Sequence, residues 1–118
     1  MATIKGTYLA THAVEGSTYV ITFNTKDSTG AAVVANSGLV WSLTDQYGNI
    51  VNSREDEAID SALEMEVVLE GDDLAILQDQ LEEVRVFTVE GTYDSDIGDD
   101  KPIKSQCWFY VDNLVKPG

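Results

Sequence analysis

The sequence predicts an all-β fold, an antiparallel β-sandwich of about seven strands with one short helical turn. Apolar and polar residues alternate in several short runs, as at Tyr19, Ile21 and Phe23. A period of two over four to eight residues is typical of a strand with one buried face and one exposed face. Turn residues separate the runs, and 118 residues are the length of one domain, so residues 1–118 are expected to fold as a single unit.

The first half of the chain is expected to contribute five extended segments. A run rich in Thr and Tyr, with Gly6 as a bend, precedes a clear alternating segment that starts at Thr18. Between later segments, Gly48 or Asn49 can adopt the positive φ of a tight turn. The expected strands are residues 3–12, 18–26, 31–34, 39–44 and 50–52.

The second half is expected to hold an acidic loop, three strands and the helical turn. In the first of these strands, glutamates alternate with apolar residues on one face, namely Leu63, Met65, Val67 and Leu69. Asp72 is placed to cap a short helix whose leucines share one face, namely Leu74, Leu77 and Leu81. The expected strands are residues 62–69, 84–93 and 103–111, and the expected loops are residues 53–61 and 94–102.

The order of these elements matches an immunoglobulin-like sandwich with a helical connection between strands E and F. Trp41 then takes the place of the buried tryptophan on strand C, where truncation to Ala costs about 3–5 kcal/mol. Cys107 is the only cysteine, so the inter-sheet cysteine pair of antibody domains is absent. The shared alternation predicts one common core that contains Phe23, Trp41, Leu43, Val67, Phe87 and Phe109.

Charge and composition narrow the classes of partner. The chain has 21 acidic and 7 basic residues, a formal net charge of −14. Nucleic acids and anionic membranes attract clustered Lys and Arg, so neither is an expected partner. The charge fits either simple solubility or docking onto a basic protein surface. A single cysteine indicates a reducing compartment, and we expect neither a signal peptide nor a membrane helix of roughly 20 apolar residues.

No pattern typical of catalysis or metal binding stands out. His12 is expected at a strand edge, and Cys107 alternates with Phe109, which is typical of a small core residue. Carboxylates crowd residues 94–100, but the EF-hand spacing is not met, because the glycine comes one position early and Ser105 replaces the final glutamate. We therefore expect a solvated loop there, with no catalytic residue, no metal and no cofactor.

Three stretches of the chain carry a family resemblance. They are Ile-Thr-Phe at 21–23 with Asp27 and Gly30, Trp-Ser-Leu-Thr-Asp at 41–45 with Gly-Asn-Ile-Val-Asn at 48–52, and Leu-Glu-Gly-Asp-Asp-Leu at 69–74 with residues 86–89 and 92–95. Over roughly residues 18 to 111 the chain resembles small bacteriophage virion structural proteins with an Ig-like β-sandwich. The first two stretches are also similar to the N-terminal strands of phage baseplate upper proteins.

The resemblance implies a virion component that is assembled in the host cytoplasm, either a capsid decoration (cement) protein or a neck or tail adaptor. Its partners would be other virion structural proteins or further copies of this chain, and the family has no catalytic residue to carry over. An alternative is an Ig-like binding module of a bacterial surface or adhesion protein, with or without dependence on calcium. A small hydrolase, the third possibility, lacks the necessary His and Ser constellation.

The expected contact residues lie in the N-terminal run and in the loop of residues 94–102. Residues 2–8 carry one charge and no proline, which leaves an edge strand without the usual protection against pairing. This run either adds a strand to a neighbouring sheet or pairs within its own sandwich, and the sequence leaves both alternatives open. The candidate partner-binding residues are Thr3, Ile4, Lys5, Thr7, Ile97 and Lys101.

Overall fold

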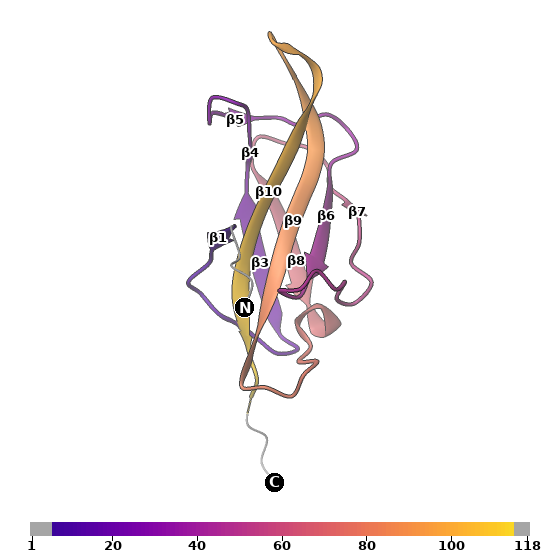
Figure 1. Ribbon diagram of the computed structural model, residues 1–118. Coiled ribbons are helices and arrows are strands. Elements are labelled where there is room, and N and C mark those ends of the chain that lie inside the picture. Colours follow the sequence, from indigo (N-terminus) through magenta and orange to yellow (C-terminus); the bar gives the residue numbers. More distant parts are fainter. Residues whose placement is uncertain (1–5, 115–118) are drawn as a thin grey trace.

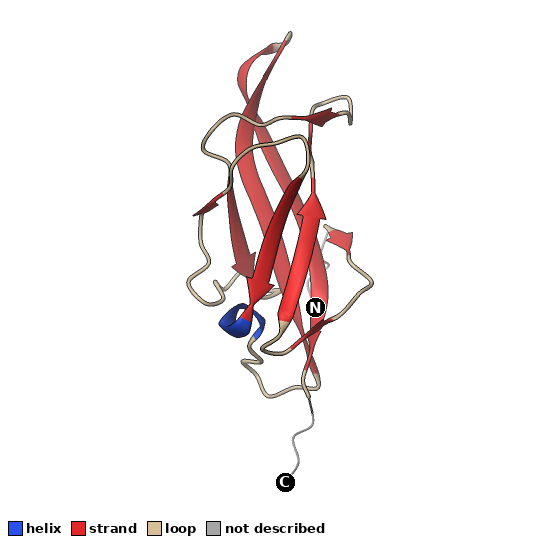
Figure 2. Cartoon of the chain, turned by 180° about the vertical axis from the view of Figure 1, so that it is seen from behind, coloured by secondary structure: helices blue, strands red, loops and turns tan. Residues whose placement is uncertain are grey.

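The computed structural model describes residues 6–114 of the chain. These residues form an all-β sandwich with a single 3-10 turn, as the sequence predicts (Figures 1 and 2). The elements are β1 (Thr7–Tyr8), β2 (Ala13–Val14), β3 (Thr18–Phe23), β4 (Thr25–Lys26), β5 (Ala32–Val33), β6 (Val40–Thr44), β7 (Glu57–Ala58), β8 (Met65–Glu70), η1 (Gly71–Leu74), β9 (Glu82–Ser95) and β10 (Gly98–Asp112).

A large sheet faces a smaller one across the core. The large sheet follows the order β1-β10-β9-β6-β7, and β2 also pairs with β10. The smaller sheet is the antiparallel pair β3–β8, and β4–β5 forms a separate short pair. In chain order, β3, β6, β8, β9 and β10 correspond to strands B, C, E, F and G of an immunoglobulin-like sandwich. At one edge β1 and β2 run parallel to β10, whereas the other pairs are antiparallel.

The described residues contain ten strands rather than about seven, because five of the ten have only two residues each. The segment expected at residues 18–26 breaks at Asn24 into β3 and β4, and the loop expected at 53–61 contains β7. Residues 50–52 form no strand, since Ile50 makes only an isolated bridge to Thr44. Strands of two residues show no alternation, so their existence depends on neighbours that are distant in sequence.

The core lies between the inward faces of the two sheets. Within β8, buried and exposed residues alternate strictly, which is the pattern expected from its sequence. Five of the six predicted core residues are buried, and the sixth, Phe23, is partly buried and packs against the same cluster. Trp41 is only 6% exposed, and its ring centroid lies 5.4 Å from that of Phe87. The predicted register of the central strand is therefore confirmed.

Two predictions around β8 are wrong. Leu63 is 58% exposed, because β8 begins only after it, and the backbone at Leu63 is not part of the ladder. The helical turn η1 ends at Leu74, so Leu77 and Leu81 do not share a buried helix face and are instead exposed. The expected cap, Asp72, is also exposed. The next residue, Asp73, instead stabilises the start of the turn through a hydrogen bond from the Glu70 backbone N–H.

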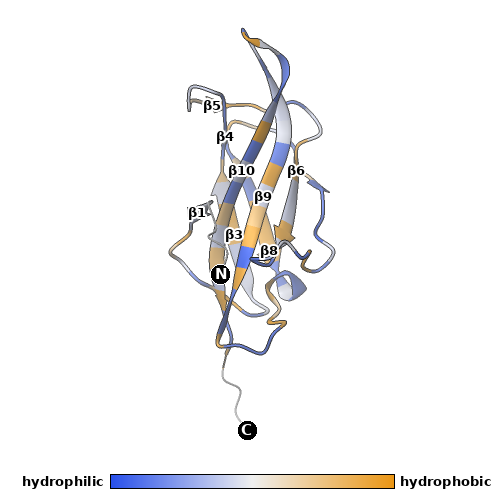
Figure 3. Cartoon of the chain, viewed as in Figure 1, coloured by the Kyte–Doolittle hydropathy of each residue, from blue (hydrophilic) through white to orange (hydrophobic). Residues whose placement is uncertain are grey.

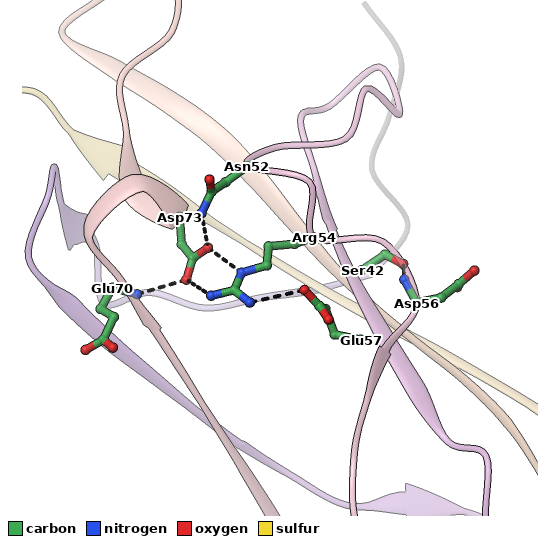
Figure 4. Close-up of polar contacts among 7 residues, drawn as sticks. All are labelled: Ser42, Asn52, Arg54, Asp56, Glu57, Glu70 and Asp73. Carbon is green, nitrogen blue, oxygen red and sulfur yellow. Dashed lines mark hydrogen bonds and ion pairs between the residues drawn. The ribbon is translucent and has the colours of Figure 1, made fainter.

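That neighbour, Asp73, is fully buried and links η1 to the loop before β7 (Figure 4). Its carboxylate accepts hydrogen bonds from Arg54 Nε at 2.7 Å, from the Asn52 side-chain amide at 2.8 Å and from the Glu70 backbone N–H at 3.1 Å. Burial raises the pKa of Asp73, but the hydrogen bonds from Arg54 and Asn52 outweigh burial and lower the pKa below its usual value. We call these four residues the Asp73 clamp.

Strands β9 and β10 form a long antiparallel hairpin that extends beyond the rest of the sandwich (Figure 1). Both strands are longer than the expected segments 84–93 and 103–111. The loop expected at residues 94–102 is therefore mostly strand, and only Asp96 and Ile97 form the turn. The polar composition of residues 94–102 indicated a loop. However, the end of a hairpin that has no facing sheet needs no apolar face, so the hydrogen bonds between β9 and β10 can continue through polar residues.

Candidate interaction surface

The protruding end of this hairpin, residues 94–101, is the leading candidate for a contact surface, and we call it the hairpin arm (Figure 1). The β9–β10 ladder is interrupted between Gly98 and Lys101. At this point Asp100 adopts a left-handed φ of 52°, which is uncommon for a residue with a side chain. Irregularities of this kind bend a strand and increase its twist, and they are common at sheet edges and next to active sites, where they redirect a side chain or end the pairing.

Hydrogen bonds from a single asparagine hold the base of the hairpin arm. The side-chain amide of Asn36 donates to Oδ1 of Asp94 at 3.0 Å and to Oδ1 of Asp100 at 3.3 Å. The Asp100 backbone N–H also donates to Asp94 Oδ1, at 2.9 Å. The hydrogen bonds from Asp100 and Asn36 lower the pKa of Asp94 below its usual value, so this carboxylate stays ionised at neutral pH. The base of the arm is thus ordered by contacts with the loop between β5 and β6.

The tip of the hairpin arm is apolar and exposed. Ile97 is 66% exposed, and the carboxylates of Asp96 and Asp99 flank it in the sequence and are exposed as well. Figure 3 shows a hydrophobic stretch at the top of the hairpin among mostly hydrophilic residues. A large apolar side chain within an acidic ribbon suits contact with a partner that is apolar at the centre and basic around it.

The candidate partner-binding residues within the described part of the chain lie in two separate regions. Ile97 and Lys101 belong to the hairpin arm, although Lys101 is half-buried and its side chain packs beside Gly98. Thr7 is exposed in β1 and pairs with Cys107 of β10. Cys107 lies six positions after Lys101 in β10, which corresponds to about 20 Å along the strand. The two groups therefore belong to different surfaces.

The N-terminal candidates Thr3, Ile4 and Lys5 lie outside the described residues. The next part of that run, Thr7–Tyr8, pairs with β10 of its own sandwich. Gly6 approaches the backbone of β10 closely, because a Cβ at this position would lie 2.5 Å from the Gln106 carbonyl oxygen. Of the two alternatives for the N-terminal run, pairing within its own sandwich is therefore the one observed for residues 7–8.

A cluster of partly exposed aromatic rings was not among the residues predicted from the sequence. Tyr8, Trp108 and Tyr110 lie on the outer face of β1 and β10, with ring centroids 4.5 Å apart for Tyr8 and Trp108 and 5.7 Å apart for Trp108 and Tyr110. The ring of His12 lies 5.3 Å from that of Tyr110. A sequence signal existed, since aromatic residues occupy three consecutive positions at 108–110 and one face of a strand cannot bury all three.

An open groove of about 990 Å³ runs beside β3 and β10, and its walls include Ile21, Phe23 and Ile103. Cys107 also lines the groove and is half-buried, and burial raises the pKa of its thiol to about 11. A thiol with such a pKa is neutral at pH 7, whereas a nucleophile reacts as the thiolate. The groove thus offers an apolar wall and no activated sulfur.

Comparison with known proteins gives no match, either to a family model or to a curated protein or solved structure. In residues 6–114 no helix has the length and apolar character needed to cross a membrane. The structural support for a function therefore comes from the hairpin arm and the aromatic cluster. Both are surfaces suited to macromolecular contact.

Proposed function

We propose that this chain is a non-enzymatic structural component of a phage virion, a capsid decoration (cement) protein or a neck or tail adaptor, that acts through protein–protein contacts. Its partners are other virion structural proteins or further copies of the chain. The proposal rests on the resemblance of the strand-and-turn stretches and on one observation, the protruding hairpin arm with an exposed isoleucine at its tip.

An isolated two-stranded ribbon is marginally stable in water, because it lacks a second layer on which to bury side chains. The hairpin arm is such a ribbon, and Asn36 fixes it only at its base. Exposing Ile97 at the tip brings no benefit to the isolated chain. Burying Ile97 against another subunit would stabilise the ribbon and the assembly together, which is the reason to assign a docking role to the arm.

The aromatic cluster supports the same function, because it offers a second surface suited to protein–protein contact. Tyr and Trp are enriched in protein–protein interfaces, where their large rings contribute much of the binding energy. Tyr8 is 44% exposed, although it packs against Trp108. Two separate contact surfaces on a small sandwich would let one copy bridge two larger subunits.

The function is tested on a phage whose genome encodes this chain. Virions purified by density gradient are analysed by quantitative mass spectrometry, and we expect the chain in fixed proportion to the major capsid protein. Many copies per capsid indicate a decoration protein, and a small fixed number indicates a neck or tail adaptor. Recovery only from the cell envelope of the host would refute the proposal and favour the adhesion module.

The role of the hairpin arm is tested with matched variants in the same phage. Ile97→Asp places a charge at the tip and should remove the chain from purified virions. The control is Leu81→Asp, because Leu81 is 80% exposed in the connection that precedes β9. That variant should be incorporated normally. Normal incorporation of Ile97→Asp would refute the role of the arm.

A further inference from the structure

Three side chains with metal-binding atoms meet at the end of the large sheet where β10 finishes. They come from distant parts of the sequence, namely His12 before β2, Glu82 at the start of β9 and Asp112 at the end of β10. The potential ligand atoms of the three all lie within 4.8 Å of one another. In the described part of the chain, no other group of three His, Cys, Asp or Glu residues meets this condition.

The sheet register sets two carboxylates directly opposite each other. Glu82 is the cross-strand partner of Asp112 in the β9–β10 ladder, and like charges in this position destabilise a sheet. The net charge of −14 adds to the negative potential around them. A cation between the two carboxylates would remove this repulsion, so the register itself indicates a positively charged ligand.

The imidazole of His12 indicates the kind of cation. Its Nδ1 lies 2.9 Å from Asp112 Oδ1, and its ring packs against Tyr110, which limits the positions that it can take. Calcium and magnesium prefer oxygen ligands only, whereas imidazole together with carboxylates suits zinc and other late first-row divalent ions. The side chains of His12 and Asp112 are 34% and 44% exposed, so they can adjust and water can complete the coordination.

We infer that His12, Glu82 and Asp112 form a binding site for a late first-row divalent metal ion, with Zn²⁺ as the reference ion. This inference goes beyond the proposed virion function and differs from the sequence-based expectation of no metal ligand. Zinc bonds to nitrogen and oxygen are about 2.0–2.2 Å long, so two ligand atoms on one zinc ion lie within roughly 4.4 Å of each other, close to the 4.8 Å within which these atoms lie. The ion would join the segment before β2 to both strands of the long hairpin.

A bound metal ion would stabilise the pairing of β2 with β10 at the parallel edge of the large sheet. Strand β2 has only two residues, and its ladder with β10 consists of the pairs Val111↔Ala13 and Asp112↔Val14. Such a short strand opens easily, because few contacts hold it. A metal ion held by His12 and Asp112 ties the strand down, so binding should slow amide exchange at Ala13 and Val14.

The test uses tag-free, full-length protein from which metal has been stripped with a chelator. Zn²⁺ is titrated in by calorimetry, and thermal melts are recorded with and without saturating Zn²⁺. We expect one ion per chain and a midpoint that rises by about 3–8 °C. Co²⁺ should give the visible absorption bands of a site with one nitrogen ligand. Heat that never saturates would overturn the site.

Variants assign the binding to these three residues. His12→Gln, Glu82→Gln and Asp112→Asn should each weaken Zn²⁺ binding by more than about tenfold while the metal-free protein still folds. Asp99→Asn removes a carboxylate from the distant hairpin arm and should leave binding unchanged, and so should Cys107→Ser. Binding that survives His12→Gln, or that is lost in Cys107→Ser, would place the ion elsewhere and refute the inference.

Discussion

The Asp73 clamp and the hairpin arm lie at opposite ends of one sandwich, and both are built around aspartates (Figures 1 and 2). At the clamp, Asp73 has no exposed surface, and donors from three residues in two segments of the chain satisfy its oxygens. In the hairpin arm, Asp96 and Asp99 are exposed beside an exposed isoleucine. The same residue type therefore stabilises the fold at one end and faces solvent at the other.

The difference follows from where the core ends. The β3–β8 sheet is shorter than the β9–β10 hairpin, so it covers only part of the large sheet. The helical turn η1, which carries Asp73, lies near the lower end of this covered part in Figure 1. Beyond the covered part the β9–β10 ladder continues without a facing layer. We therefore expect substitutions near the clamp to change stability, and substitutions in the hairpin arm to change association but not stability.

The largest expected effect is that of Trp41→Ala. Trp41 is buried, contacts Phe87 and lies under Arg54, whose guanidinium carbon is 5.6 Å from the ring centroid. Its loss should lower the free energy of unfolding by about 3–5 kcal/mol, measured by urea denaturation. The matched control is Trp108→Ala, since the other tryptophan is only half-buried and should cost less than half as much. Equal losses for both would contradict the comparison.

The next effect is that of Asp73→Asn. The amide keeps the shape of the side chain but removes the buried carboxylate from the Arg54 guanidinium, which keeps only its more exposed partner, Glu57, so we expect a loss of about 2–3 kcal/mol. The same change at Asp99 should leave the urea midpoint where it is, because that carboxylate is exposed. An Asp73→Asn variant with unchanged stability would show that packing of η1, and not the clamp, stabilises this end.

The clamp should also make stability depend on pH. The pKa of Asp73 in the folded chain is lower than in the unfolded chain, so its stabilising contribution is complete above the unfolded pKa of 3.8. The contribution disappears as the pH falls from that value through the folded pKa. Urea midpoints measured between about pH 5 and pH 2 should therefore fall more steeply for the natural chain than for Asp73→Asn. Parallel curves would contradict this assignment.

A smaller effect on stability is expected for Ile97→Asp in the hairpin arm. The side chain is 66% exposed, so the free energy of unfolding should change by no more than about 0.5 kcal/mol. Thermal melts of the purified chain provide the measurement. A large loss of stability would mean that the tip packs within its own chain, and the contrast between the two ends would then disappear.

The smallest expected effect is that of calcium on the hairpin arm. Oδ1 of Asp94 already accepts hydrogen bonds from Asn36 and from the Asp100 backbone, so these contacts compete with calcium for one of the carboxylate oxygens in the arm. Calorimetry with millimolar calcium should give no saturable heat. A melting midpoint that rises by several degrees with calcium alone would instead support the calcium-dependent adhesion module.

The sequence determined the fold class and the core faces of the longer strands. Alternation in β3, β6 and β8 is a local property, so the burial of Tyr19, Trp41 and Met65 could be predicted from neighbouring residues alone. Ile97 was also a candidate from sequence, since an isolated apolar residue stands out within a run of aspartates. These features need no knowledge of which strands pair.

Only the tertiary structure decided the rest. The bond of Arg54 to Asp73, the convergence of His12, Glu82 and Asp112, and the distance between Thr7 and the hairpin arm all depend on register between strands far apart in the chain. Register is set by the joint burial of many side chains across two sheets, and no local period encodes it. The length of the β9–β10 ladder could not be predicted from the sequence either, because backbone hydrogen bonds can form whatever side chains a strand carries.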